Sequence, residues 1–517
     1  MRIDALDLDL ERLPAPLSMG RRRVGAAQWS SIAIAVAQTG GRLVSLWGRF
    51  GLRGDEDGCI VSAAYALPEG LVWIDLALAG GNTGYPDISG VFPCAGRMQR
   101  AVADLLGLKA EGAADPRPWF NHGAWPADHF PLRRSVGGGA QGDWPEAGDY
   151  PFVNVRGDGV HEIPVGPVHA GIIEPGHFRF SAVGEKVLRL EERLGYKHKG
   201  IDKRFQDMPA HDGYRMAGRV SGDSTVAFAW AYCMALETAA KCLVPPRAQW
   251  LRALMLERER VANHLGDLGA LGNDAAFAFG LAQFMRLKED WLRLNKALFG
   301  HRFMMDRVVP GGVSVDLDSA GVAEIVTQCG AVAEEVRALS AIYEGHSGLQ
   351  DRFITTGRVT PQQAVQLGLT GLAGRASGIA RDLRANYPID PYADLDFQLA
   401  GHRNGDVAAR VAVRFAELME SLRLIRLIAE HLPLGSIVQI PDPVTHASRG
   451  AGWVEGWRGE VFVAIEVADD NTVARCHCHD PSWQNWPVLE HAVIGNIVPD
   501  FPLINKSFNL SYAGHDR

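Results

Sequence analysis

The sequence predicts an α+β protein, because strand-like segments lie near both ends of the chain and long amphipathic segments with helical periodicity lie between them. With 517 residues, the chain is too long for one ordinary hydrophobic core, so we expect at least two domains. Hydrophobic residues make up 47% and charged residues 22% of the chain, the usual mixture of a globular protein. The predicted architecture is a small α/β domain followed by a larger, mainly helical bundle with small peripheral sheets.

The N-terminal segments predict the smaller domain, at residues 1–135. Residues 43–50 and 70–76 combine alternation with β-branched and aromatic side chains, as half-buried strands do. Residues 98–106 carry their apolar side chains on one helical stripe. The glycine-rich run that follows populates too many backbone states to belong inside an element. It is the core of a predicted linker at residues 136–160, which is followed by a second domain at residues 161–517.

The second domain is predicted to open with strands and then to become strongly helical. Residues 247–268 have the apolar spacing of a long amphipathic helix. Its charged residues would form a solvated face, and they are Glu257, Glu259, Arg260 and His264. Further helices are expected at residues 277–298, 322–343, 361–369 and 406–431. Strands are expected at residues 163–168, 178–183, 461–467 and 472–478.

The bulk properties exclude several classes of protein. A formal charge of −8 is mild for this length and argues against nucleic-acid binding, which needs a basic surface. The N-terminus is acidic and lacks the apolar segment of a signal peptide. No stretch approaches the roughly 18 consecutive apolar residues of a membrane span. Seven scattered cysteines suit a reducing compartment, so we expect a cytoplasmic chain without a span of its own.

The densest group of metal-ligand types is the run Cys476, His477, Cys478, His479 and Asp480. Such ligands suit zinc, but the segment has the pattern of a strand, in which successive side chains point to opposite faces. The two cysteines and the two histidines would therefore face apart and could not enclose one ion. We expect two buried thiols and two solvent-facing histidines.

The residues offer few other signs of chemistry. The glycine-rich run precedes no helix and lacks the lysine of a phosphate-binding loop. His169, Glu174 and His177 lie together in a predicted strand–loop–strand region, where a polar surface turn and a functional site are equally open. Taken alone, these residues indicate only a multi-domain, mainly helical protein.

Ordered segments along nearly the whole chain resemble one family. Residues 85–89, 103–108, 115–118 and 129–134 resemble the 30-kDa-type subunit of respiratory complex I. Further segments resemble the 49-kDa-type subunit of the same complex, and they are residues 166–169, 174–179, 195–203, 310–313, 375–382 and 485–496. The fusion of both parts is most similar to the large subunit of formate-hydrogenlyase-type, energy-converting nickel–iron hydrogenases. The resemblance implies the small N-terminal domain and the helical bundle described above.

The resemblance places two Cys-x-x-Cys pairs where the family holds nickel and iron, and this chain has none of those cysteines. Ser221 and Ser224 stand at the first pair, and Ser511 and Gly514 stand at the second. A serine hydroxyl is hard and stays protonated at neutral pH, whereas such a nickel site needs thiolates. We therefore expect no metal in this chain. By the resemblance, the family's large subunits are clipped after metal insertion at the position of Arg517. Two expectations stay open, a chain made without that tail because it takes no metal, and a chain that has been processed.

The neighbours of the former metal site predict a polar pocket. By the resemblance, Arg458 matches an arginine that overlooks the metal, and Trp457 stands where proline is usual. Asp223 is new at its position, and a buried unpaired charge is costly, so we expect Asp223 and Arg458 to be close. The remodelled pocket would consist of Ser221, Asp223, Ser224, Arg458, Ser511 and Gly514.

The resemblance also suggests a region that binds quinone or transfers protons. Complex I-type subunits hold the quinone with a histidine of the first strand–loop–strand turn and with a tyrosine. His169 and His177 lie in that turn, but the tyrosine position falls on Gly222. Asp202 takes the place of a glutamate associated with proton movement. Quinone therefore stays open as a ligand.

The resemblance implies a subunit of a membrane-associated electron-transfer complex with a scaffolding or coupling role. Its expected partners are an iron–sulfur small subunit, which would carry the cluster, and antiporter-like membrane subunits. The chain would lie peripherally on the inner face of the cell membrane. The alternatives are a subunit that reduces quinone at the remodelled pocket and a stand-alone assembly or regulatory protein.

Overall fold

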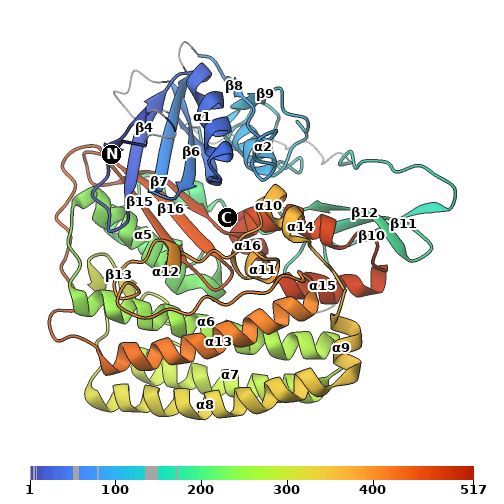
Figure 1. Ribbon diagram of the computed structural model, residues 1–517. Coiled ribbons are helices and arrows are strands. Elements are labelled where there is room, and N and C mark those ends of the chain that lie inside the picture. The colour runs from blue at the N-terminus through green and yellow to red at the C-terminus, as the bar shows by residue number, and fades with distance from the viewer. Residues whose placement is uncertain are drawn as a thin grey trace.

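The computed structural model describes residues 2–3, 6, 8–50, 58–78, 81–133, 149–169 and 173–517. The fold is α+β, as the sequence predicts. The N-terminal sheet lies at the top of the molecule, a second sheet and helix α5 lie in the middle, and a layer of long helices lies at the bottom (Figure 1).

The N-terminal part is a five-stranded sheet with two helices. Its strands follow the order β3-β4-β7-β6-β5, in which β4 and β7 are parallel and the other neighbours are antiparallel. The elements are β3 (Glu11–Arg12), β4 (Met19–Val24), α1 (Ala26–Gln38), β5 (Arg42–Phe50), β6 (Cys59–Leu67), β7 (Gly70–Leu78) and α2 (Ala95–Leu106). Two short pairs complete it, β1 (Arg2–Ile3) with β2 (Leu8–Asp9) and β8 (Gly84–Pro86) with β9 (Lys109–Glu111). The strands and the helix predicted here correspond to β5, β7 and α2.

A three-stranded antiparallel sheet follows. It consists of β10 (Val160–Val165), β11 (His177–Val183) and β12 (Lys186–Arg193). The strand predicted at residues 163–168 ends earlier, because Gly166 has a φ of 84° and the next residue is a proline, which has no N–H for the ladder. Residues 149–159 of the predicted linker contain neither helix nor strand, and its glycine-rich core at 137–142 lies outside the described residues.

Four long helices form the lower layer of Figure 1. They are α6 (Pro246–Asp274), α7 (Ala278–Phe299), α8 (Ser319–Gly345) and α13 (Val407–Glu430), and each corresponds to a predicted helix. The shorter elements around them are α3 (Ile201–Arg204), α4 (Gly213–Ala217), β13 (Val308–Val309), β14 (Gly312–Val313), α9 (Ser347–Phe353), α10 (Pro361–Leu367), α11 (Gly371–Ala376) and α12 (Leu383–Asn386). The C-terminal elements are α14 (Ser482–Ala492), α15 (Phe501–Phe508) and α16 (Tyr512–Asp516).

Helix α5 (Thr225–Ala240) packs on the antiparallel sheet of β15 (Ser448–Glu455), β16 (Glu460–Val467) and β17 (Val473–His479). Nearly all of α5 is buried. Its sequence therefore lacks the one-sided apolar stripe by which a surface helix is recognised. The close approach depends on Gly450 and Gly452, since a Cβ on either would overlap the carbonyl oxygens of Ala235 and Ala231.

The N-terminal sheet covers one face of β17, and this corrects the prediction for the two histidines. His477 and His479 are 3% and 2% exposed, not solvent-facing. The His477 ring stacks on Trp47 of β5 at 5.0 Å, and His477 Nε2 bonds Ser45 Oγ at 2.7 Å. The cysteines of the same strand are buried on its other face, as the alternation predicts.

The prediction that the charged residues of α6 form a solvated face is also wrong. Glu257, Arg260 and His264 are fully buried and Glu259 is 6% exposed, because α5, α7 and α13 surround this helix. The carboxylate of Glu257 accepts hydrogen bonds from neighbouring side chains rather than from water. They come from Arg384 Nη1 at 3.0 Å, Tyr392 Oη at 2.6 Å and Ser421 Oγ at 2.6 Å.

The ionised form of Glu257 is nevertheless favoured. Burial opposes it, but the charges of Arg384 and Arg260 outweigh burial and lower the pKa of Glu257. The network extends to Glu417, which accepts hydrogen bonds from Arg375 Nε at 2.6 Å and pairs with His264 Nε2 at 3.0 Å. Buried charges of this kind are tolerated because each has a partner.

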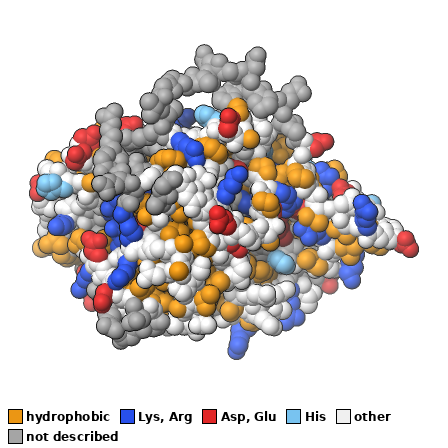
Figure 2. All heavy atoms as spheres, turned by 90° about the horizontal axis from the view of Figure 1, so that it is seen from above, with side chains coloured by type: hydrophobic (Ala, Val, Ile, Leu, Met, Phe, Trp, Pro, Cys, Tyr) orange, Lys and Arg blue, Asp and Glu red, His pale blue; other side chains and the backbone are white. Residues whose placement is uncertain are grey.

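The described helices include none that is both long and apolar enough to cross a bilayer. On the face shown in Figure 2, hydrophobic side chains lie among charged and polar ones.

The Glu257→Gln variant tests this network. The change removes the carboxylate charge that Arg384 and Arg260 share, while Asp382 still pairs with Arg384 Nη2 at 2.7 Å. We therefore expect the free energy of unfolding to fall by about 1–3 kcal/mol. Urea denaturation measures it. The matched control is Glu334→Gln at an exposed position of α8, which should change stability by less than about 0.5 kcal/mol. Equal effects of the two variants would contradict the assigned role of the network.

Candidate functional site

The residues predicted for the remodelled pocket come together at the N-terminus of α5. Ser221, Asp223 and Ser224 lie in the turn that leads into this helix. Arg458 projects from the turn between β15 and β16. Ser511 is the N-cap residue of α16, and its Oγ accepts a hydrogen bond from the Gly514 N–H at 2.8 Å.

A bidentate ion pair occupies the centre of the site, and this is the contact predicted from the cost of an unpaired charge. Arg458 Nη1 lies 2.8 Å from Asp223 Oδ1, and Nη2 lies 2.5 Å from Oδ2. Such paired hydrogen bonds are strong and directional. Arg458 is 7% exposed, and its guanidinium lies 3.9 Å over the Trp457 ring. The tryptophan that replaces the family's proline thus supports the arginine.

The carboxyl group of Asp223 stays ionised in this setting. Burial raises its pKa, but the charge and hydrogen bonds of Arg458 and the hydrogen bond from Ser221 outweigh burial and lower the pKa of Asp223 to about 2. Ser221 Oγ donates to Asp223 Oδ1 at 2.7 Å and lies 2.9 Å from Ser511 Oγ. The serine hydroxyls and the carboxylate therefore bind one another.

The residues at the former cysteine positions do not fit a nickel–iron centre. Three hydroxyls and a hydrogen replace the thiolates, and the nearest carboxylate is held by Arg458. A Cβ at Gly514 would overlap the Asp480 carboxyl group, so a side chain at this position would require Asp480 to move. Among the described residues, no group of three or more His, Cys, Asp or Glu is placed to hold a metal ion.

The site opens into a polar cavity of about 520 Å³. Its wall opposite the serines carries Asp267, Lys288 and Lys506. Asp267 pairs with Arg414 Nη2 at 3.0 Å and with Lys506 Nζ at 3.7 Å. Burial lowers the pKa of Lys288, although the charges of Asp267 and Asp223 partly offset this. Sequence reasoning missed these residues, because α15 is far from α6 and α7 in the chain and no motif links the three helices.

A second carboxyl group lies behind the ion pair. Glu259 of α6 accepts hydrogen bonds from the Val226 N–H at 2.7 Å and the Ala227 N–H at 3.2 Å. Burial outweighs these bonds, and with the nearby Asp223 charge it raises the pKa of Glu259 to about 8. Glu259 therefore keeps its proton at neutral pH, whereas Asp223 does not.

The structure does not bring His169, His177 and Asp202 together. None of the three is among the described residues that line the polar cavity. His177 lines a separate cleft beside Phe152, and the His169 ring lies 6.1 Å from that of Phe178.

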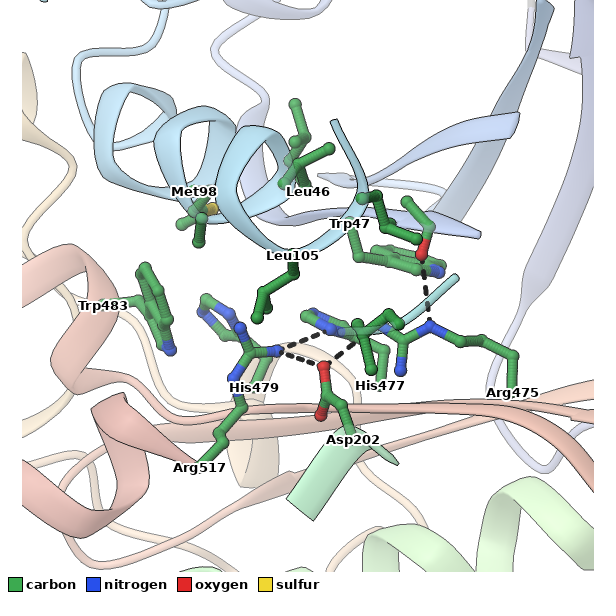
Figure 3. A pocket seen from close by; sticks show the side chains of 15 residues that line it. Leu46, Trp47, Met98, Leu105, Asp202, Arg475, His477, His479, Trp483 and Arg517 are labelled. Carbon is green, nitrogen blue, oxygen red and sulfur yellow. Dashed lines mark hydrogen bonds and ion pairs between the residues drawn. The ribbon is translucent and has the colours of Figure 1, made fainter. Parts of the chain in front are cut away.

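Asp202 lies in a buried contact between α3 and the N-terminal part (Figure 3). Its Oδ2 pairs with Arg475 Nη2 at 3.0 Å and with Arg517 Nη1 at 3.2 Å. Arg517 in turn lies 2.8 Å from His477 Nδ1. The free volume here is about 10 Å³, no more than one water molecule needs. Asp202 therefore contributes to the packing between the N-terminal part and the rest of the chain.

The Asp223→Ala and Arg458→Met variants, alone and combined, measure the interaction free energy between the two side chains. Losing one partner of a buried pair costs about 3–5 kcal/mol. Because 37% of the Asp223 side chain is exposed, water compensates in part, and we expect about 1–2 kcal/mol for Asp223→Ala. The double variant should lose less stability than the sum of the single variants in urea denaturation. Additive losses would contradict the pairing.

The Glu259→Gln variant tests the raised pKa. Between its ordinary pKa of 4.5 and its folded value of about 8, the folded protein holds a proton that the unfolded chain has released. The contribution of Glu259 to stability is therefore complete below about pH 4.5 and is lost as the pH rises toward 8. We expect wild type to lose stability relative to Glu259→Gln from pH 5 to pH 8, measured by urea midpoints. Parallel pH profiles would refute the protonated state.

Comparisons with known proteins agree with this fold. Residues 271–451 match the family model of the respiratory-chain NADH dehydrogenase 49 Kd subunit, and residues 36–141 match that of the 30 Kd subunit. Formate hydrogenlyase subunit 5 of Escherichia coli is 30% identical over 84% of this chain and 77% of its own length. The C/D fusion protein of NADH-quinone oxidoreductase from Phocaeicola vulgatus is 27% identical over 74% of this chain and 78% of its own length.

A solved structure shares the fold. One chain in the structure of the membrane-bound sulfane sulfur reductase, an archaeal respiratory membrane complex, has a TM-score of 0.65 and 24% identity. The match covers 69% of this chain and 98% of that chain. The chain described here belongs to the family of fused 30-kDa-type and 49-kDa-type subunits that includes formate hydrogenlyase subunit 5 and the C/D fusion proteins of NADH-quinone oxidoreductase.

Proposed function

We propose that this chain is the large subunit of a membrane-associated electron-transfer complex, that it holds no nickel–iron centre, and that its role is scaffolding or coupling. The observation that carries the proposal is the ion pair between Asp223 and Arg458. It stands, with the serines around it, where the resemblance places the metal ligands.

The chemistry of the site supports the absence of the metal. To hold nickel here, the protein would have to separate a bidentate ion pair and bind the metal through protonated hydroxyls. Both changes are unfavourable, because Arg458 would be left buried without its partner and hydroxyls are poor ligands for this metal. Gly514 supplies no fourth ligand, and the Asp480 carboxyl group lies where its side chain would begin.

The expected partners follow from the kind of complex in which the relatives occur. By their names, the relatives are components of formate hydrogenlyase, of hydrogenases and of NADH-quinone oxidoreductase. The described helices of this chain include no candidate span. We infer an iron–sulfur small subunit that carries the cluster, and antiporter-like membrane subunits that hold this chain at the inner face of the membrane.

A quinone-reducing site in the polar cavity is less favoured. Cavities that bind apolar rings are mostly lined by apolar and aromatic side chains. This cavity has Arg458, Lys288 and Lys506 in its walls, together with Asp223 and Asp267. The position of the family's tyrosine is Gly222, which supplies no phenol.

Metal content and partners can be measured on one preparation. The affinity-tagged chain is purified from solubilised membranes of cells that make it with its neighbouring subunits. Plasma mass spectrometry should then find nickel far below one atom per chain and iron in excess of it, because the cluster belongs to a partner. Protein mass spectrometry should identify an iron–sulfur subunit and membrane subunits.

The control is a formate hydrogenlyase complex purified and assayed in the same way, which should contain nickel. One nickel atom per chain would overturn the proposed loss of the centre. Recovery of the chain alone from the soluble fraction would overturn the assignment to a complex and would favour a stand-alone assembly or regulatory role. The two parts of the proposal can therefore fail separately.

A further inference from the structure

A second and larger cleft, of about 660 Å³, lies where the N-terminal part meets the hairpin of β11 and β12. It shares no lining residue with the polar cavity around Arg458. Its described walls come from residues 118–127 and 149–152 on one side and from residues 177–196 on the other. A volume of this size accommodates a small organic ligand.

Aromatic rings line both sides of the cleft. The ring centroids of Tyr150 and Phe152 are 4.8 Å apart in a T-shaped contact, and the His177 ring lies 5.2 Å from that of Phe152. Trp125 and Tyr196 also line the cleft, and Tyr196 is 38% exposed. Ring faces and edges of this kind bind planar ligands by stacking.

Guanidinium groups alternate with these rings. The Cζ of Arg193 lies 4.2 Å from the centroid of the Tyr150 ring, and that of Arg179 lies 4.5 Å from the centroid of the Phe152 ring. Arg179 also pairs with Glu162 at 2.9 Å. The rings are therefore held in place by cation–π contacts, which leaves them ordered before any ligand arrives.

Arg193 carries a buried charge that no described carboxylate contacts. It is 3% exposed, and its donors reach only the Pro118 carbonyl at 2.5 Å and the Asn121 carbonyl at 3.2 Å. Burial and the nearby Arg100 lower the pKa of Arg193 to about 10, and the more distant Asp104 charge offsets this only in part, so Arg193 is still cationic at neutral pH. The carbonyl oxygens accept hydrogen bonds from Arg193 but do not neutralise its charge. An anion in the cleft would do so.

The remaining titratable groups of the cleft do not supply that anion. Burial lowers the pKa of His122 to about 4, and it also lowers the pKa of His177. Both rings are neutral near pH 7 and add no negative charge. Asp149 is the one acid among the described lining residues, and it is exposed.

We propose that this cleft binds a small planar aromatic anion, such as a mononucleotide, with its ring against Tyr150 and Phe152 and its anionic group toward Arg193 and Arg179. The aromatic side chains select a planar ring, and the guanidinium of Arg193, which no described carboxylate contacts, selects a negative charge. The site is independent of the proposed loss of the nickel–iron centre, because it lies at a different junction of the fold.

Isothermal titration calorimetry of the full chain with adenosine monophosphate, flavin mononucleotide and nicotinate tests the proposal. At least one of these planar anions should bind about tenfold or more tightly than adenosine, which lacks the anion, and inorganic phosphate, which lacks the ring. Phe152→Leu and Arg179→Gln should each weaken that binding by about tenfold, and neither change removes the buried Arg193. The control is Phe279→Leu, at a 49% exposed ring outside the cleft, which should bind as wild type does.

Three results would overturn the proposal. The first is that none of the planar anions binds at about 1 mM. The second is that phosphate alone binds as tightly as the nucleotides, which would indicate simple anion attraction without a ring site. The third is that Phe152→Leu and Arg179→Gln bind as tightly as Phe279→Leu, which would place the ligand elsewhere. Circular dichroism of each variant checks that the fold is retained.

Discussion

The ion pair between Asp223 and Arg458 decides what the centre of this protein can hold. Two parallel hydrogen bonds join the groups, Ser221 donates to the carboxylate, and the Trp457 ring lies beneath the guanidinium. A metal that bound here would have to compete with an arrangement in which each charge already has a partner. The same pair lowers the pKa of Asp223 and, through the carboxylate charge, helps to keep the proton on Glu259. The chemistry of the pocket follows from this one contact.

Many buried charges of the helical layer have a charged partner, although Arg258 and Arg410 are held by neutral acceptors. Glu257 is fully buried and is stabilised by Arg384, Arg260 and two hydroxyl groups. Two other buried groups, Glu259 and Arg193, also have no oppositely charged group in contact. Glu259 keeps its proton, and Arg193 faces a space in which no described carboxylate meets it. The second case is the basis for proposing a ligand there.

The two parts of the chain are joined by a buried interface that is both polar and aromatic. Trp47 stacks on His477, Ser45 binds the same ring, and Arg517 links it to Asp202. Residues far apart in the sequence thus share one interior surface, and both large hydrophobic clusters contain residues from the two parts. The cleft beside Phe152 opens at another edge of the same junction, so the joining of the two parts also creates a cavity.

The sequence by itself determined the α+β class, the four long helices and the family, because apolar periodicity and the order of motifs are local properties of a chain. Through the resemblance it also predicted serine or glycine at the positions of the metal-ligand cysteines, and the cost of unpaired charge predicted the contact between Asp223 and Arg458. Only the tertiary structure decided that Glu257, His264, His477 and His479 are buried, since a polar residue on a periodic segment has the same pattern whether water or another helix faces it. The packing of helices that are distant in the sequence brings Lys506 to the same cavity as Asp267 and Lys288. The same packing keeps Asp202 away from that cavity. A local sequence pattern carries no information about such packing.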